Sequence, residues 1–209
     1  SAVNTGANIP SAPTITTASV TTATIVINQN GNPSSVSYSI QDTTSSLYVQ
    51  ANGSLGAGPV YQTYSSWGGV SGITVTGLTA PTTYTFAVVA RNSQGVNMAA
   101  SGAPTFFIAA NPAAPTVTAA STTGLTAVIN GNGNPSSALY YICLTLDGST
   151  CENNGFIQAD GTLGAQGSRL LQTYAAWGGA SGSTISGLSV NTGYRFLVRA
   201  NNAIDDAIS

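Results

Sequence analysis

The feature that most constrains this 209-residue chain is an internal duplication. Residues 30–35 (NGNPSS) recur unchanged 102 positions later, at residues 132–137. Residues 62–69 (QTYSSWGG) recur 110 positions later, at 172–179, as QTYAAWGG. Self-similarity at such a spacing indicates a repeated structural unit, and about 100 residues are enough for a domain that folds alone. We therefore predict two tandem copies of one domain, the second with eight extra residues between these two landmarks.

Apolar and polar residues alternate with period two in each copy, which predicts strands with one buried face. The apolar positions of one such run are Ala23, Ile25 and Ile27 in the first copy and Leu125, Ala127 and Ile129 in the second. Clusters of Gly, Pro, Asn and Ser punctuate these runs at short intervals, and no helical period of useful length is present. Short strands with frequent turns predict an all-β sandwich.

The landmarks predict four segments. These are an extended N-terminal arm over 1–12, a sandwich over 13–110, a Pro/Ala linker over 111–115 and a second sandwich over 115–209. The second copy is expected to lack most of its last strand, whose counterpart in the first copy lies at 104–108. Three readings of that open edge remain: a longer array of domains, a strand donated by a neighbouring subunit, or closure by residues 203–209.

Charge is scarce, and this excludes several classes of function. Charged residues make up 5% of the chain, and its four arginines and six acids leave a net charge of −2. Nucleic-acid binding and attraction to anionic membranes both need clustered basic residues, so we expect neither partner. No apolar run is long enough to insert in a membrane. The uncharged, Ser/Thr-rich composition is typical of cell surfaces, so we expect an extracellular location.

Catalysis and metal binding lack the residues they need. The chain has no histidine, hence no Ser–His or Cys–His pair and no imidazole ligand. Of the acids, only Asp205 and Asp206 are adjacent, and neighbours on a strand point to opposite faces. We expect no enzyme activity, no catalytic residue, no metal and no cofactor; a calcium ligand set at these two acids is the alternative.

A resemblance to bacterial fibronectin type III domains rests on residues 78–92 (LTAPTTYTFAVVARN) and their repeat at 188–201. In that family a Leu, a turn and a Tyr precede alternating apolar residues that end in Ala-x-Asn. The resemblance implies a sandwich with a tyrosine corner, formed here by Tyr84 and Tyr194. The family's early buried Trp is missing, and Trp67 and Trp177 come later, before the fifth strand.

The repeated Tyr–Trp–Gly–Gly segment is the sharpest candidate for ligand contact. Exposed faces of Tyr64, Trp67, Tyr174 and Trp177 could stack on a carbohydrate or a partner, with the glycines leaving room for a ring. The alternative is that these aromatic side chains pack over the edge of the sandwich, since large aromatics in a small domain usually lie in the core.

Cys143 and Cys151 lie in the insertion of the second copy. A three-residue hairpin loop at 146–148 would place them opposite each other, which predicts a disulfide and an oxidising compartment. Free thiols or a two-cysteine metal site are the alternatives. Asn52 heads an Asn-Gly-Ser glycosylation sequon, a weak three-residue signal.

These features favour a non-catalytic structural protein: a subunit or segment of an extracellular filament, a pilus-like stalk or an adhesin. It would assemble by self-association or by packing on neighbouring copies of the same domain. The alternatives are a carbohydrate- or partner-binding spacer attached to a secreted polysaccharide-degrading enzyme, and a viral surface decoration domain. Fold alone does not separate these roles.

Overall fold

The computed structural model describes residues 6–17 and 19–201, which form two compact units that meet in sequence between Ile108 and Ala109. The all-β prediction is confirmed, since every regular element in these residues is a strand or a short 3₁₀ turn. The three turns are η1 (Gly69–Ser71), η2 (Gln166–Ser168) and η3 (Gly179–Ser181).

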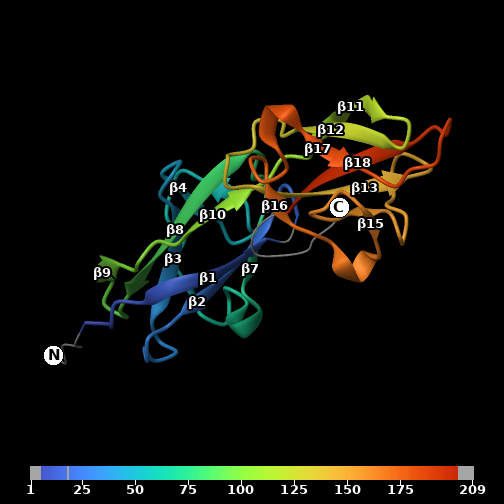
Figure 1. Cartoon of the computed structure of the whole chain (residues 1–209). Helices are drawn as coiled ribbons and strands as arrows, with labels where there is room; N and C mark the ends of the chain where they lie inside the picture. Colours follow the sequence, from blue (N-terminus) through green and yellow to red (C-terminus); the bar gives the residue numbers. More distant parts are fainter. Residues whose placement is uncertain (1–5, 18, 202–209) are drawn as a thin grey trace. The chain divides into compact units, whose positions relative to one another are not determined.

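The first unit is a sandwich of two antiparallel sheets (Figure 1). One sheet has the order β1-β2-β7; the other has the order β10-β8-β3-β4-β5, with β6 paired to β3 and β9 to β8. The first sheet consists of β1 (Ser11–Thr17), β2 (Ala23–Asn28) and β7 (Ile73–Val75). The second consists of β3 (Ser37–Asp42), β4 (Leu47–Val49), β5 (Leu55–Gly56), β6 (Gln62–Thr63), β8 (Thr82–Arg91), β9 (Asn97–Ala100) and β10 (Thr105–Ile108).

The second unit repeats this plan. Its sheets have the orders β11-β12-β17 and β15-β14-β13-β16, with β18 paired to β13. The strands are β11 (Ala113–Ser121), β12 (Gly124–Asn130), β17 (Ser183–Ile185), β13 (Leu139–Thr145), β14 (Phe156–Ile157), β15 (Leu163–Gly164), β16 (Gln172–Thr173) and β18 (Arg195–Asn201). The antiparallel register of β12 with β17 copies that of β2 with β7, as duplication of one fold requires.

The period-two pattern places the core between the sheets. Ala23, Ile25 and Ile27 are all buried along β2, while the residues between them are half-buried. In β12 the small and large residues exchange places, and Ala127 and Ile129 are buried there. Such an exchange keeps the volume of the core layer roughly constant.

Both sandwiches begin earlier than the composition indicated. β1 starts at Ser11, inside the expected arm, and β11 starts at Ala113, inside the expected linker. The register shifts between Ser11 and Thr14, and again between Ala113 and Thr116, where a proline interrupts each strand. Proline lacks the N–H that a ladder needs, so it sits in a bulge and pairing resumes on both sides.

The expected gap in the last strand of the second unit concerns the chain after residue 201, which lies outside the described residues. Within them, the corresponding strands β8 and β18 differ in length. β8 begins at Thr82, because Thr82–Thr85 pair with β10; the rest of β8 pairs with β3. β18 begins only at Arg195, where its pairing with β13 starts. The first four residues of β8 are therefore part of the strand because they pair with β10.

We predict that Phe106→Ala destabilises the first unit by about 3–5 kcal/mol. Phe106 is buried on β10, and its ring centroid lies 5.8 Å from that of Tyr84 and 5.9 Å from that of Phe86. Hydrogen exchange of first-unit peptides against urea measures the loss in the intact chain. The matched control is Phe107→Ala, on the opposite face and only half-buried. Equal losses for the two variants would contradict this account of the core.

Candidate functional site

The two longest repeated motifs lie side by side in each unit. In the first, the turn after β2 and Tyr64 line one groove that also includes Thr14 and Val26. In the second, the turn after β12 and Tyr174 line the equivalent groove with Thr116 and Val128. Duplication has therefore preserved a surface feature built from the Asn-Gly-Asn turn and the Tyr–Trp–Gly–Gly loop.

The tryptophans are buried and anchor this loop to the sheet. Trp67 is 1% exposed and Trp177 is 2% exposed, so neither presents a ring face. Trp67 Nε1 donates a hydrogen bond of 2.7 Å to the backbone carbonyl of Tyr38, and Trp177 Nε1 donates one of 2.8 Å to that of Tyr140. The sequence-based reading of an exposed indole is therefore corrected: the indole bonds to the sheet, because a buried N–H needs a partner.

Glycines let the loop press against the sheet. Gly72 has φ +71°, and a Cβ there would lie 2.4 Å from the carbonyl oxygen of Ile25 on β2. Gly68 has φ +87°, and its Cβ would lie 2.0 Å from the carbonyl oxygen of Gly72. Only glycine meets both demands. Gly68 and Gly72 thus permit a close approach of backbones, and room for a ligand ring beside the Gly-Gly pair stays a prediction.

Tyr64 and Tyr174 are the exposed part of the motif. Both side chains are half-buried and line the grooves, and each ring lies beside a glycine of its own loop. A Cβ at Gly179 would lie 3.7 Å from Tyr174 Cε1. The structure thus separates the four predicted contact residues into two buried anchors and two tyrosines available at the surface.

The second asparagine of each Asn-Gly-Asn turn holds the segment that enters its own unit. Asn32 Oδ1 accepts the N–H of Asn8 at 2.6 Å, and its Nδ2 donates to the carbonyl of Asn8 at 2.8 Å. Asn134 does the same for Ala110, at 2.7 and 2.9 Å. We call each pair of bonds an asparagine clamp. The sequence marked the repeat of this turn but not the clamp, because its partner lies 24 residues upstream.

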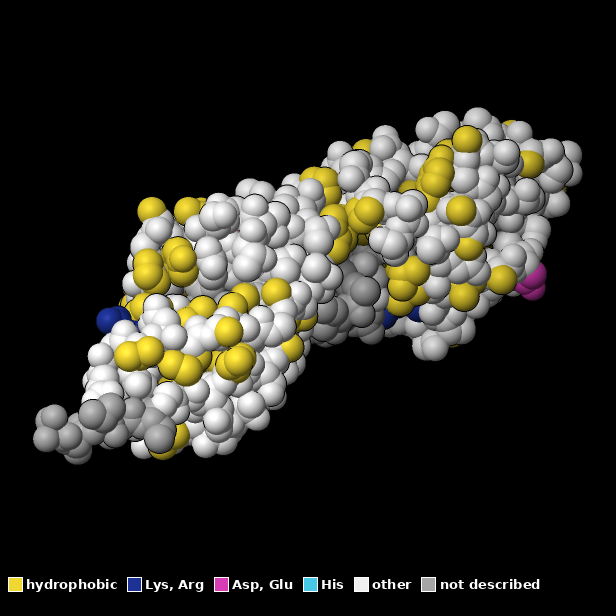
Figure 2. Space-filling view, turned by 90° about the vertical axis from the view of Figure 1, so that its left-hand side faces the viewer, with side chains coloured by type: hydrophobic (Ala, Val, Ile, Leu, Met, Phe, Trp, Pro, Cys, Tyr) yellow, Lys and Arg dark blue, Asp and Glu magenta, His cyan; other side chains and the backbone are white. Residues whose placement is uncertain are grey.

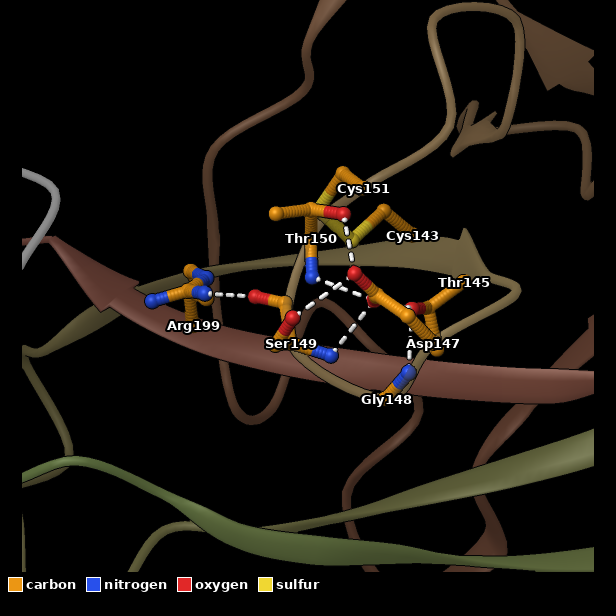
Figure 3. The surroundings of a disulfide bond; sticks show 8 residues. All are labelled: Cys143, Thr145, Asp147, Gly148, Ser149, Thr150, Cys151 and Arg199. Carbon is orange, nitrogen blue, oxygen red and sulfur yellow. Dashed lines mark hydrogen bonds between the residues drawn. A yellow bond between two sulfur atoms is a disulfide. The ribbon is translucent and has the colours of Figure 1, made fainter.

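The predicted disulfide joins Cys143 and Cys151, whose Cα atoms are 5.6 Å apart (Figure 3). The predicted hairpin loop is wrong in detail. Cys143 pairs across the sheet with Phe156 of β14, and residues 146–150 form bends without strand structure. The extra residues make this wider loop, so the disulfide closes a loop at the end of β13, a strand paired to β14 on one side and to β18 on the other.

A single carboxylate organises that loop. Asp147 Oδ1 accepts the N–H groups of Ser149 and Thr150 at 2.7 and 2.8 Å, and Oδ2 accepts their hydroxyls at 2.8 and 2.9 Å (Figure 3). These backbone and hydroxyl donors lower the pKa of Asp147 well below its ordinary value. Arg199 of β18 donates to the carbonyl of Ser149, which ties the loop to the sheet.

The insertion also covers the outer face of its sheet. Tyr141 and Cys143 alternate with core residues along β13 and are buried together with Phe156 in a second small cluster. The Tyr141 and Phe156 ring centroids are 5.8 Å apart, and the Arg169 guanidinium lies 5.0 Å from the Tyr141 centroid. The insertion thus contributes to a small buried cluster on the face of the sheet that points away from the main core.

Each tyrosine corner has the same hydrogen bond. Tyr84 Oη accepts the N–H of Thr79 at 2.8 Å, and Tyr194 Oη accepts that of Ser189 at 2.8 Å. The hydrogen bond from the Ser189 backbone N–H is the main cause that lowers the pKa of Tyr194. Tyr84 is buried while Tyr194 is only half-buried, since Phe106 covers the former.

The remaining candidates from the sequence are Asn52 and the acids Asp205 and Asp206. Asn52 is exposed in the turn between β4 and β5, and its glycosylation stays a prediction. Asp205 and Asp206 lie outside the described residues. In residues 6–17 and 19–201, no three His, Cys, Asp or Glu side chains gather as a metal site. The same residues contain no helix long and apolar enough to cross a membrane.

We predict that Gly72→Ala destabilises the first unit more than Gly77→Ala does. Both glycines have positive φ, +71° and +76°, so each alanine has a backbone penalty of about 1–2 kcal/mol. Only at Gly72 would the new Cβ meet backbone, while Gly77 faces open space. The clash adds about 1–3 kcal/mol. Urea unfolding measures the difference, and equal losses would show that the close approach is unimportant.

We predict that the disulfide loop loosens only under acid. Because folding depresses the Asp147 pKa below its ordinary 3.8, the carboxylate stabilises the loop fully above that value. This contribution is lost as the pH falls through the folded-state pKa. Amide NMR of Ser149 and Thr150 from about pH 5 down to about pH 1 follows it. Asp147→Asn should abolish the pH dependence, and an unchanged acid transition in that variant would assign it to another group.

The sequence matches no protein-family model and no curated protein. Among solved structures, it is similar to domains FN1 to FN3 of chicken CNTN1, with 15% identity over 95% of this chain and 62% of that one, at a TM-score of 0.45. A two-domain fibronectin type III segment of chicken tenascin matches with 10% identity over 95% and 94%, at 0.38. A chitinase from Bacillus thuringiensis matches with 15% identity over 97% and 28%, at 0.34.

The fold assignment rests on the geometry of the chain itself. Each unit has two packed antiparallel sheets and a tyrosine corner before its long central strand, the arrangement that the sequence resemblance implied. The bacterial subtype stays a prediction. The chain consists of two tandem fibronectin type III-like β-sandwiches.

Proposed function

We propose that this chain is a non-catalytic structural protein of the cell surface: a subunit or segment of an extracellular filament, stalk or adhesin. The asparagine clamp carries the proposal. It recurs in both units and attaches the entering segment to each sandwich through both backbone groups of one residue. Such a clamp limits the motion of the chain where a domain begins. A structural array needs this property, and a catalytic domain has no particular use for it.

The surface chemistry supports the same role. Figure 2 shows a face on which hydrophobic side chains are scattered and charged ones are isolated. With ten charged residues in 209, electrostatic repulsion between neighbouring copies is weak and insensitive to salt. Packing of like domains on one another is therefore opposed by little charge.

The disulfide supports an extracellular location. Disulfides persist in oxidising compartments and are rare in the cytosol. Cys143 is fully buried, and its bond to Cys151 closes the loop that covers the Tyr141 cluster. Reduction would release that loop, so an oxidising environment maintains the fold of the second unit.

The test is immunogold electron microscopy of the source cells with antibodies against this chain. We expect label along surface appendages in the wild type and none in a deletion strain. The matched variant carries Asn32→Ala and Asn134→Ala, which should speed proteolysis at the unit entrances about tenfold, because each clamp loses two hydrogen bonds. Asn52→Ala is the control. Cytoplasmic label, or appendages unchanged by deletion, would refute the structural role.

A further inference from the structure

The two equivalent grooves differ at one position in their floor. In the first unit this position is Gln29; in the second it is Gly131. The groove of the second unit is larger, about 600 Å³ against about 380 Å³. Tyr140 lines the second groove, whereas its counterpart Tyr38 is absent from the lining of the first. Loss of a side chain at residue 131 therefore opens the groove down to a tyrosine.

Tyr140 places a hydroxyl at this floor. The residue is 1% exposed, and a Cβ at position 131 would lie 2.8 Å from its Oη. Burial raises the pKa of Tyr140, with the nearby Asn134 amide acting in the opposite direction. The phenol is therefore neutral at physiological pH and can donate a hydrogen bond. A buried hydroxyl at the base of an open groove is a fixed point of recognition.

The walls combine one aromatic ring with amides and hydroxyls. Tyr174 and Val128 supply apolar surface; Thr116, Asn130 and Ser136 supply polar groups, and all three are exposed. Asn130 Oδ1 accepts the N–H of Asn132, and within the described part of the chain its Nδ2 donates no hydrogen bond. No charged side chain lines this groove.

This chemistry selects a class of ligand. An ion would find no counter-charge here, and a purely apolar ligand would bury the amides and the phenol without partners. A neutral sugar has hydroxyls for the polar groups and a C–H face for the tyrosine ring. The groove is open to solvent, so a sugar residue can enter it. We propose that the groove of the second unit binds a neutral oligosaccharide through Tyr174, Asn130 and Tyr140, and that Gln29 closes the equivalent groove of the first.

The proposal is independent of filament formation, because it concerns one surface of one unit. The duplication supplies an internal comparison: the ring, the turn and the anchoring tryptophan are present twice, and residue 29 or 131 is the difference. The first unit carries a glutamine at this position, whereas a Cβ at residue 131 would displace the Tyr140 hydroxyl; Gly131→Gln therefore changes the floor of the groove in two ways.

The test is a glycan array on the intact chain, printed with neutral oligosaccharides of glucose, mannose, galactose, xylose and N-acetylglucosamine and with sialylated counterparts. We expect binding to at least one neutral series and not to its acidic counterpart. Calorimetry with the best neutral oligosaccharide should give one site per chain. Gly131→Gln should weaken binding at least about tenfold, and Tyr140→Phe about fivefold, for the loss of one hydrogen bond.

Two variants in the first unit complete the experiment. Tyr64→Ala is the matched control and should leave affinity unchanged, whereas Tyr174→Ala should abolish binding. Gln29→Gly should raise the stoichiometry from one site to two. Unchanged melting of Gly131→Gln confirms that the fold is retained. Absence of binding to every neutral series, binding to acidic glycans alone, full affinity in Gly131→Gln, or a stoichiometry unchanged by Gln29→Gly would overturn the proposal.

Discussion

The hydrogen bond from a buried indole to the backbone of the central strand determines how each unit presents its surface. Trp67 and Trp177 bond to the carbonyls of Tyr38 and Tyr140, and this draws the following glycines against the neighbouring sheet. The loop has little freedom, because its tryptophan is fixed in the core and its glycine backbone packs closely on the sheet. The tyrosine three residues before each tryptophan is consequently held at the rim of a groove.

Neutral amides take over the roles that charged residues have in many proteins. Asparagine side chains clamp the entering segments; the charged exception is Asp147, which accepts hydrogen bonds from five donors in the disulfide loop. Amide–backbone bonds are insensitive to salt, and a side chain that satisfies both backbone groups of a residue does what a neighbouring strand would do. A protein with very few charges can therefore still order its turns and ends.

Much of the fold could be predicted from the sequence because its signals are local. The repeat, the alternation along β2 and β8 and the tyrosines of the corners are patterns within a few residues. The disulfide was also predicted, since its cysteines are only eight positions apart. The hairpin between them was wrong: Cys143 pairs with Phe156, because a longer loop brings a later strand into register.

The sequence by itself determined the duplication, the all-β class, the scarcity of charge and the aromatic motif. Only the tertiary structure decided which aromatics are exposed, since the tryptophan and tyrosine of one motif point to opposite environments through contacts with strands far away in sequence. It also decided that Gly131 matters, because a side chain there would meet the hydroxyl of Tyr140, nine residues further along the chain. Periodicity along the chain reports burial on average, whereas the shape of a groove depends on which side chains meet in space.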